Sequence, residues 1–179
     1  MNIVLFGFKG VGKTYYGKKV AEKLGWQFVD IDDLIQEEYE KDNGEKLEIP
    51  EIFEKVGNVP FRDIEQKVTC KLNPESDTII SVGGGTVLNP PNIDHLQTVA
   101  HFIYLIDKKE AVKQRMLDER IPSYLDANNF DASFDKMYGM RNPIYKKLAE
   151  ASLDLPSCSS EEEIVEKLIE LIDSFRKKD

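Results

Sequence analysis

The chain has 179 residues, of which 24 are lysine or arginine and 33 are aspartate or glutamate, so its formal net charge is −9. The length and a hydrophobic content of 41% predict one domain over residues 1–179 and exclude a disordered chain, and two cysteines suggest neither a disulfide framework nor a four-cysteine zinc site. The charge argues against binding to nucleic acid or membrane surfaces but allows a local basic pocket, and no apolar run approaches the roughly 20 residues of a membrane span, so we expect a cytoplasmic protein.

Short apolar runs alternate with longer amphipathic stretches along the chain. The apolar runs lie at residues 3–6, 28–31, 78–82, 102–106 and, more weakly, 153–155, and continuous runs of this length are typical of strands covered on both faces. Helical patterns lie at 14–24, 33–40, 60–72, 108–118 and 134–150, and a last helix follows a capping box at Ser160 and Glu163. This alternation predicts an α/β fold with three layers, α/β/α, around a five-stranded parallel sheet. Ligands bind such sheets beyond the C-terminal strand ends, so functional residues should follow the apolar runs.

Residues 7–14, GFKGVGKT, follow the first apolar run and match the phosphate-loop pattern G-x-x-x-x-G-K-[ST]. The glycines let backbone N–H groups surround phosphate oxygens, and the helix starting near Lys13 directs its positive end at them. We expect Lys13 to reach the β- and γ-phosphates and the Thr14 hydroxyl to ligate Mg²⁺. The alternative is a glycine-rich turn with a chance Lys-Thr pair, but the position between a strand and a helix favours nucleotide binding.

Asp30 and Asp32 end the second apolar run. Because a strand sends alternate side chains to one face, both carboxylates can point toward the phosphate loop. One could hold Mg²⁺ through water while the other accepts a proton from a hydroxyl nucleophile. Asp33 would point elsewhere and is expected to cap the next helix. The alternative is an acidic strand end that only caps this helix.

Arg62 and Glu65 are spaced i, i+3 on a predicted helix and can interact. An arginine held in this way is suited to bidentate capture of a carboxylate, although it could also be a solvated helix charge. Three glycines at 83–85 follow the next strand and let a ligand approach the backbone closely, unless they form only a flexible loop.

Basic residues gather late in the chain, with Arg115 and Arg120 at the end of one helix and Arg141 on the next. Residues 121–133 between them have little periodicity and are expected to form a mobile lid. Arg120 on this lid could neutralise charge on a transferred phosphoryl group, or it could be an ordinary surface charge.

Together these motifs resemble the shikimate kinase family. The shared features are the phosphate loop, Asp30-Ile-Asp32, the sequence IPEIF at 49–53, Phe61-Arg62 with Glu65, the glycines at 83–85, Arg120, and RNPIY at 141–145. They follow the family's order and spread over roughly residues 1–147. Many families share the phosphate loop, whereas Asp-x-Asp followed by Phe-Arg-x-x-Glu and Gly-Gly-Gly is far more specific.

The resemblance implies ATP-dependent phosphorylation of shikimate at its 3-hydroxyl, giving shikimate 3-phosphate and ADP in chorismate and aromatic amino-acid biosynthesis. It implies a phosphate-loop kinase fold like that of the nucleoside monophosphate kinases, with a substrate-binding helical segment at about 33–62 and a lid at about 119–133. ATP and shikimate would be the partners of a monomer, and Mg²⁺ would be the cofactor.

The resemblance also assigns residues by position. ATP would contact Gly10, Val11, Gly12, Lys13, Thr14, Tyr15, Arg115 and Arg120, and Mg²⁺ would be held by Thr14 and Asp30. Shikimate would contact Asp32, Ile49, Phe53, Phe61, Arg62, Glu65, Gly83, Gly84, Gly85 and Arg141. Lys13 and Arg120 would stabilise phosphoryl charge, and Asp32 would act as the base or orient the hydroxyl.

The chain departs from the family in three places. Members usually have Arg-Pro-Leu-Leu at the lid, whereas Arg120 is followed here by Ile-Pro-Ser-Tyr-Leu. Tyr15 and Tyr16 follow the phosphate loop where many members have Ser or Thr, and residues 156–160 lack an arginine often placed near the adenine, so we expect altered adenine packing. Two alternatives stay open: a kinase of the same fold acting on gluconate or a nucleotide, and a nucleotide-binding regulatory module without catalysis.

Overall fold

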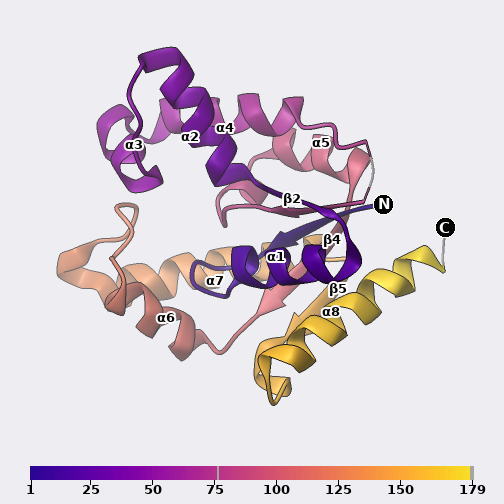
Figure 1. Ribbon diagram of the computed structural model, residues 1–179. Helices are drawn as coiled ribbons and strands as arrows, with labels where there is room; N and C mark the ends of the chain where they lie inside the picture. Colours follow the sequence, from indigo (N-terminus) through magenta and orange to yellow (C-terminus); the bar gives the residue numbers. More distant parts are fainter. Residues whose placement is uncertain (76, 178–179) are drawn as a thin grey trace.

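A computed structural model describes residues 1–75 and 77–177, and Figure 1 shows a central sheet flanked by helices. In this part of the chain, five strands form the sheet: β1 (Asn2–Phe6), β2 (Gln27–Asp30), β3 (Thr78–Ser81), β4 (His101–Ile106) and β5 (Ala151–Asp154). Their order is β2-β3-β1-β4-β5, and each adjacent pair of strands runs parallel. The predicted five-stranded parallel sheet is confirmed.

The helices follow the strands as the alternation predicted. Their bounds are α1 (Lys13–Leu24), α2 (Ile31–Asn43), α3 (Ile49–Val56), α4 (Asn58–Lys71), α5 (Pro90–Val99), α6 (Lys109–Asp118), α7 (Phe130–Leu148) and α8 (Glu161–Arg176), with short 3₁₀ turns η1 (Thr86–Leu88), η2 (Ala127–Asn129) and η3 (Leu155–Ser157). Helix α1 lies on one face of the sheet, where it contacts α8, and α7 lies on the other, against β4 (Figure 1). Among the described residues, no helix is both long enough and apolar enough to span a bilayer.

The core lies on both faces of the sheet, which explains why the strands read as continuous apolar runs. The five residues of β1 are all buried, and Phe6 packs against Tyr104 and Tyr145 at ring centroid distances of 5.3 and 5.8 Å. On the opposite face α1 lies very close to the sheet, because a β carbon at Gly17 would come within 2.7 Å of the Phe28 ring. This close packing holds the start of α1, and with it the phosphate loop, against the strand ends.

The boundary between β2 and α2 differs from the sequence prediction. Strand β2 ends at Asp30 and α2 begins at once at Ile31, because the Asp30 carboxylate accepts a hydrogen bond from the Asp32 N–H at 3.1 Å and caps the helix. Helices α3 and α5 lie outside the helical patterns that the sequence predicted. In α5 two leading prolines interrupt the pattern, although proline fits the first turn of a helix.

The predicted cap of the last helix is half right. The Ser160 Oγ accepts from the Glu163 N–H at 3.2 Å, but the Glu163 carboxylate accepts from the Ser159 N–H at 2.7 Å instead of returning to Ser160. Two hydrogen bonds therefore fix the start of α8, but the second one involves Ser159 instead of Ser160.

Candidate active site

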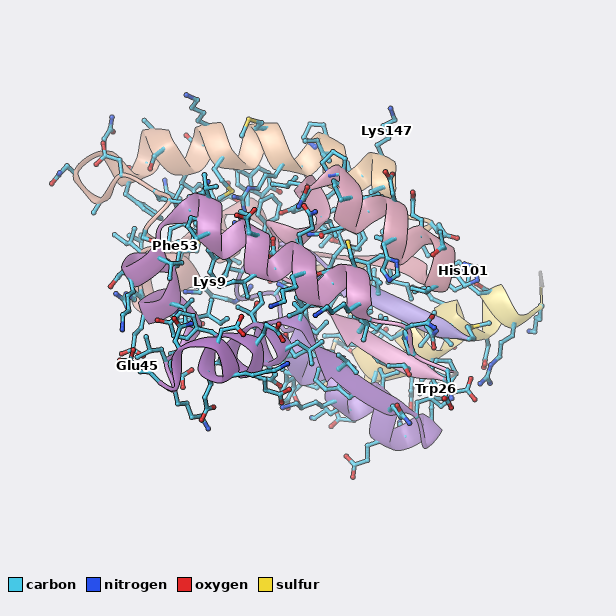
Figure 2. The ribbon with its side chains drawn as sticks, turned by 90° about the horizontal axis from the view of Figure 1, so that it is seen from above. Lys9, Trp26, Glu45, Phe53, His101 and Lys147 are labelled. Atoms are coloured by element: carbon cyan, nitrogen blue, oxygen red, sulfur yellow. The ribbon has the colours of Figure 1, made fainter. Side chains whose placement is uncertain are left out.

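A pocket of about 580 Å³ lies beyond the C-terminal ends of β1, β2 and β3 and is flanked by α3, α4 and residues 119–124. Figure 2 shows the labelled Lys9 and Phe53 at one end of the molecule, away from Trp26 and His101, and both Lys9 and Phe53 line the pocket. Most of the predicted site residues share this wall: Gly10, Gly12, Lys13, Thr14, Tyr15, Asp30, Asp32, Ile49, Phe53, Phe61, Arg62, Glu65, Gly83, Gly84, Gly85, Arg120 and Arg141.

The phosphate loop takes a conformation that depends on its glycines. Gly10 and Gly12 have φ angles of 82° and 85°, a left-handed region that glycine enters without strain, and α1 begins directly afterwards. The Lys13 Nζ donates to the backbone carbonyls of Gly7 and Phe8 at 3.2 and 3.0 Å. Burial lowers the pKa of Lys13 to about 8, although two neighbouring carboxylates act in the opposite direction. The loop therefore presents a helix N-terminus and a buried amine to the pocket.

Three oxygen-bearing side chains meet beside the loop. The Thr14 hydroxyl donates to an Asp30 carboxylate oxygen at 2.6 Å and lies 3.3 Å from the Ser81 hydroxyl. They come from the start of α1 and the ends of β2 and β3, which are brought together by the strand order. A hydroxyl beside a carboxylate is the hard-oxygen chemistry that Mg²⁺ prefers.

The expectation that Asp30 and Asp32 point the same way by strand alternation is wrong in its reason. Asp32 lies in the first turn of α2, and Asp30 rather than Asp33 is the helix cap. Both carboxylates nevertheless line the pocket, because the turn from β2 into α2 directs them there. A β carbon at Gly83 would lie 3.7 Å from the Asp32 Oδ1, so this carboxylate faces the glycine loop.

The pKa of Asp32 is raised to about 6. Burial is the largest cause, because it disfavours the charged form, and the nearby Asp30 carboxylate adds to the shift while Lys13 opposes it. A carboxyl group with this pKa is mainly ionised at neutral pH, yet it holds a proton far better than an exposed aspartate. Such a group can accept a hydroxyl proton.

The predicted pair of Arg62 and Glu65 is confirmed. The Arg62 Nη1 donates to both carboxylate oxygens of Glu65 at 2.9 and 2.8 Å, and Glu65 is 2% exposed. The Thr86 hydroxyl donates to the same carboxylate at 2.8 Å. The guanidinium stands against the glycine loop, since a β carbon at Gly85 would come within 2.5 Å of it. The hydrogen bonds to Glu65 therefore hold the Arg62 guanidinium in one orientation.

Arg141 on α7 reaches the same glycine loop from another direction. A β carbon at Gly84 would lie 3.6 Å from the Arg141 Nη1, and the Tyr145 hydroxyl donates to the Gly84 carbonyl at 2.6 Å. Two guanidinium groups from separate helices thus flank Gly84 and Gly85 in one pocket. This arrangement suits a ligand with a carboxylate, since arginine binds carboxylates through paired hydrogen bonds.

Arg120 lines the pocket, but its guanidinium forms an ion pair with Glu54 of α3 at the pocket mouth. The phosphate loop also contacts this segment, because the Lys9 Nζ lies 3.4 Å from the Arg120 carbonyl and 3.7 Å from a Glu119 carboxylate oxygen. The sequence prediction placed Arg120 toward phosphate, whereas in this structure its side chain pairs with Glu54 of α3. Both partners are about half exposed, so the pair is open to solvent.

A second hollow of about 390 Å³ adjoins the phosphate loop and contains the two remaining predicted residues, Val11 and Arg115. The Arg115 Nη2 donates to an Asp107 carboxylate oxygen at 2.5 Å, which fixes its side chain beside the loop. On the other side the Tyr15 hydroxyl and the Lys19 Nζ both donate to Glu161, at 2.5 and 2.9 Å. Residues of the phosphate loop line part of this hollow, which is large enough for part of a nucleotide.

Sequence reasoning missed Glu54 and the position of Tyr124. Glu54 partners Arg120 across 66 residues of sequence, and no local spacing signals such a contact. Tyr124 was seen only as a departure from the family lid, whereas its ring lies over Arg141 at 4.8 Å from the guanidinium carbon.

The chain is similar to known proteins over nearly its whole length. A family model described as Shikimate kinase matches residues 9–173. A shikimate kinase of Thermodesulfovibrio yellowstonii is 36% identical over 168 residues, covering 94% of this chain and 92% of the relative, and one of Thiobacillus denitrificans is 37% identical, covering 86% and 80%. A solved shikimate kinase from Acinetobacter baumannii, in complex with shikimate, superposes with a TM-score of 0.80 at 30% identity, covering 97% of this chain and 93% of that one.

Proposed function

This chain belongs to the shikimate kinase family, and on that premise we propose that its pocket transfers the γ-phosphoryl group of ATP to the 3-hydroxyl of shikimate. The products are shikimate 3-phosphate and ADP, and the reaction belongs to chorismate and aromatic amino-acid biosynthesis. One observation carries the proposal: the phosphate loop with Lys13 shares a single pocket with Asp32 and with two arginines aimed at one glycine loop.

The acceptor is held by charge at one end and by apolar contact along its ring. Arg62 and Arg141 bind the carboxylate of shikimate, and Glu65 keeps the first of them in place. Phe53 and Phe61 pack edge to face at a centroid distance of 5.2 Å and, with Ile49, form an apolar wall for the carbon ring. The backbone at 83–85 allows the ring to approach closely.

The chemistry is mainly positioning and charge stabilisation. The 3-hydroxyl oxygen bonds to the γ-phosphorus as the bond from that phosphorus to the β–γ bridging oxygen breaks, and the hydroxyl proton passes to Asp32. The raised pKa of Asp32, about 6, suits a group that must be ionised before transfer and hold a proton afterwards. Lys13 stabilises negative charge on the β- and γ-phosphates.

The residues beside the loop fit Mg²⁺. A hydroxyl and a carboxylate 2.6 Å apart are a partial set of hard oxygen donors, and Mg²⁺ in kinases takes its other ligands from water and substrate phosphates. Thr14 and Asp30 would hold the ion, Asp30 through water. When bound, Mg²⁺ neutralises charge on the phosphates.

Arg120 reaches the phosphates only after it leaves Glu54. The lid at 119–133 then excludes water, which limits transfer of phosphate to water. The substrate-binding segment at 33–62 carries Glu54, so the two moving parts meet at this ion pair. Within the same proposal, the chain acts as one domain, as a monomer in the cytoplasm, with ATP and shikimate as its ligands.

The test is an ADP-release assay with ATP and Mg²⁺, comparing shikimate with gluconate and nucleoside monophosphates. We expect ADP release that depends on shikimate, and we expect Arg62→Lys and Arg141→Lys to raise the KM for shikimate far more than the KM for ATP. Turnover of gluconate or a nucleotide in place of shikimate would overturn the acceptor assignment. ATP binding without turnover of any acceptor would favour a regulatory module.

A further inference from the structure

Tyr124 occupies a defined position above the acceptor end of the pocket. The Leu125 N–H donates to the Pro122 carbonyl at 2.9 Å, which closes a tight turn with Ser123 and Tyr124 at its centre. Leu125 is 7% exposed and anchors the turn in the core. Tyr124 itself is 42% exposed and lines the pocket. The buried Leu125 and the turn together fix the position of the exposed Tyr124 ring.

The ring of Tyr124 covers the guanidinium of Arg141. The Arg141 Cζ lies 4.8 Å from the ring centroid, within the range of a cation–π interaction. The glycine loop also lies near this guanidinium, because a β carbon at Gly84 would lie 3.6 Å from the Arg141 Nη1. The tyrosine therefore limits the orientations that this guanidinium can adopt.

The two arginines of the carboxylate site are held by different means. Arg62 is oriented by two hydrogen bonds to the carboxylate of Glu65, which also compensates its charge. Among residues 1–75 and 77–177, Arg141 has no carboxylate partner, and its Nε is buried without a hydrogen-bond partner. An aromatic ring orients a cation without neutralising it, so the charge of Arg141 stays available to a ligand.

We propose that Tyr124 is a positioning residue that sets the affinity and selectivity of this pocket for a carboxylate-bearing acceptor. Its ring aligns Arg141 for the carboxylate of shikimate and keeps water from the ion pair while the lid covers the pocket. This inference rests on the proposed function and adds to it a residue outside the assigned site.

The effect belongs to acceptor binding rather than to phosphoryl transfer. Tyr124 is on the acceptor side, while ATP is bound by the phosphate loop. Loss of a partly desolvated cation–π contact and of the cover over an ion pair should raise the KM for shikimate about tenfold, with kcat changed by less than about twofold. The KM for ATP should stay within about twofold of the unsubstituted value, because no contact to the phosphate loop is removed.

The test compares Tyr124→Leu with Tyr124→Phe in the full chain, using ADP release with shikimate and with its neutral carboxamide analogue. Phenylalanine keeps the aromatic face and leucine removes it. Tyr124→Phe should therefore retain the parent KM for shikimate, whereas Tyr124→Leu should raise it. The leucine variant should also discriminate less between shikimate and the carboxamide. Asn129→Ala, an exposed position of the same lid outside the pocket wall, is the matched control and should behave as the parent.

The outcomes of this experiment distinguish a failure of the proposed role of Tyr124 from a failure of the proposed function. Shikimate-dependent ADP release by the parent, together with an unchanged KM in Tyr124→Leu, would overturn the role of Tyr124 alone. An equal rise in the KM for ATP and the KM for shikimate would also overturn it, because it would indicate a general lid defect. Failure of the parent itself to use shikimate would overturn both proposals.

Discussion

Adding one methyl group at Gly85 should disable the acceptor site without touching the phosphate loop. Gly85 has φ and ψ angles of −79° and −28°, which alanine adopts freely, so backbone strain is not the obstacle. The obstacle is Arg62, because the new β carbon would lie 2.5 Å from both of its terminal nitrogens and 2.7 Å from its central carbon. The guanidinium must move.

The size of that movement sets the expected loss. Ordinary van der Waals contact begins near 3.4 Å, so the guanidinium must shift by about 0.9 Å. It cannot do so freely, because Glu65 holds it at 2.8 and 2.9 Å and is itself held by Thr86. A misplacement of about 1 Å in a positioning group costs roughly 100-fold, so kcat/KM for shikimate should fall about 100-fold, or about 2.7 kcal/mol.

The assay is initial-rate ADP release over a range of shikimate concentrations at saturating ATP and Mg²⁺. Gly139→Ala is the matched control, since it makes the same substitution on exposed α7 where a β carbon meets nothing within 4 Å. We expect Gly139→Ala to keep full activity and, because alanine favours helix, to raise the thermal midpoint slightly. A Gly85→Ala variant with the parent kcat/KM would refute the reasoning, as would an equal loss in both variants.

The remaining predictions concern the phosphate side of the pocket and the lid. Because Asp32 must be ionised to accept a proton and its pKa is raised to about 6, kcat/KM should fall about tenfold per pH unit below that value. Asp32→Asn should lower kcat roughly 10²- to 10⁴-fold and remove this acid limb from the pH–rate profile, and near-normal turnover would contradict the assigned role. Burial lowers the pKa of Lys13 to about 8, so the amine of the free enzyme loses its charge as the pH rises through that value. The KM for ATP should therefore increase on the alkaline side, and a KM that is flat through this range would argue against the assignment. Glu54→Gln releases Arg120 from a solvent-exposed pair and should lower the KM for ATP by about two- to fivefold at low salt, with the difference vanishing at high salt; no change at either salt concentration would exclude competition between Glu54 and phosphate. Chelation of Mg²⁺ should abolish ADP release, and Thr14→Val should raise the Mg²⁺ concentration that gives half the maximal rate, whereas an unaltered Mg²⁺ titration would exclude Thr14 as a ligand.

The sequence predicted the features that local chemistry determines. Parallel strands buried on both faces read as apolar runs, so all five were found, and the phosphate loop is a continuous stretch whose glycines have left-handed φ angles at Gly10 and Gly12. The pair of Arg62 and Glu65 lies within one helix, where spacing alone brings the side chains together. These elements need no knowledge of distant parts of the chain.

The sequence did not predict the features that depend on contacts between distant parts of the chain. The position of Asp32 was predicted for the wrong reason, because the carboxylate of Asp30 ends the strand earlier than the apolar pattern suggests. Glu54 of α3 pairs with Arg120, and the ring of Tyr124 lies over Arg141 of α7, so each of these residues contacts an arginine on another segment. Sequence periodicity does not predict such contacts, because they depend on how three separate segments pack.

The order of the strands also bears on how a newly made chain acquires its shape. Strand β1 lies at the middle of the sheet although it is synthesised first, and its hydrogen-bonded neighbours β3 and β4 begin only at Thr78 and His101. Pairing over such separations requires closure of long loops before any gain from contact. Until β3 has left the ribosome, the backbone N–H and C=O groups along both edges of β1 have no partner in the sheet. The buried side chains of β1 therefore have no sheet to pack in until the chain has been synthesised past residue 77.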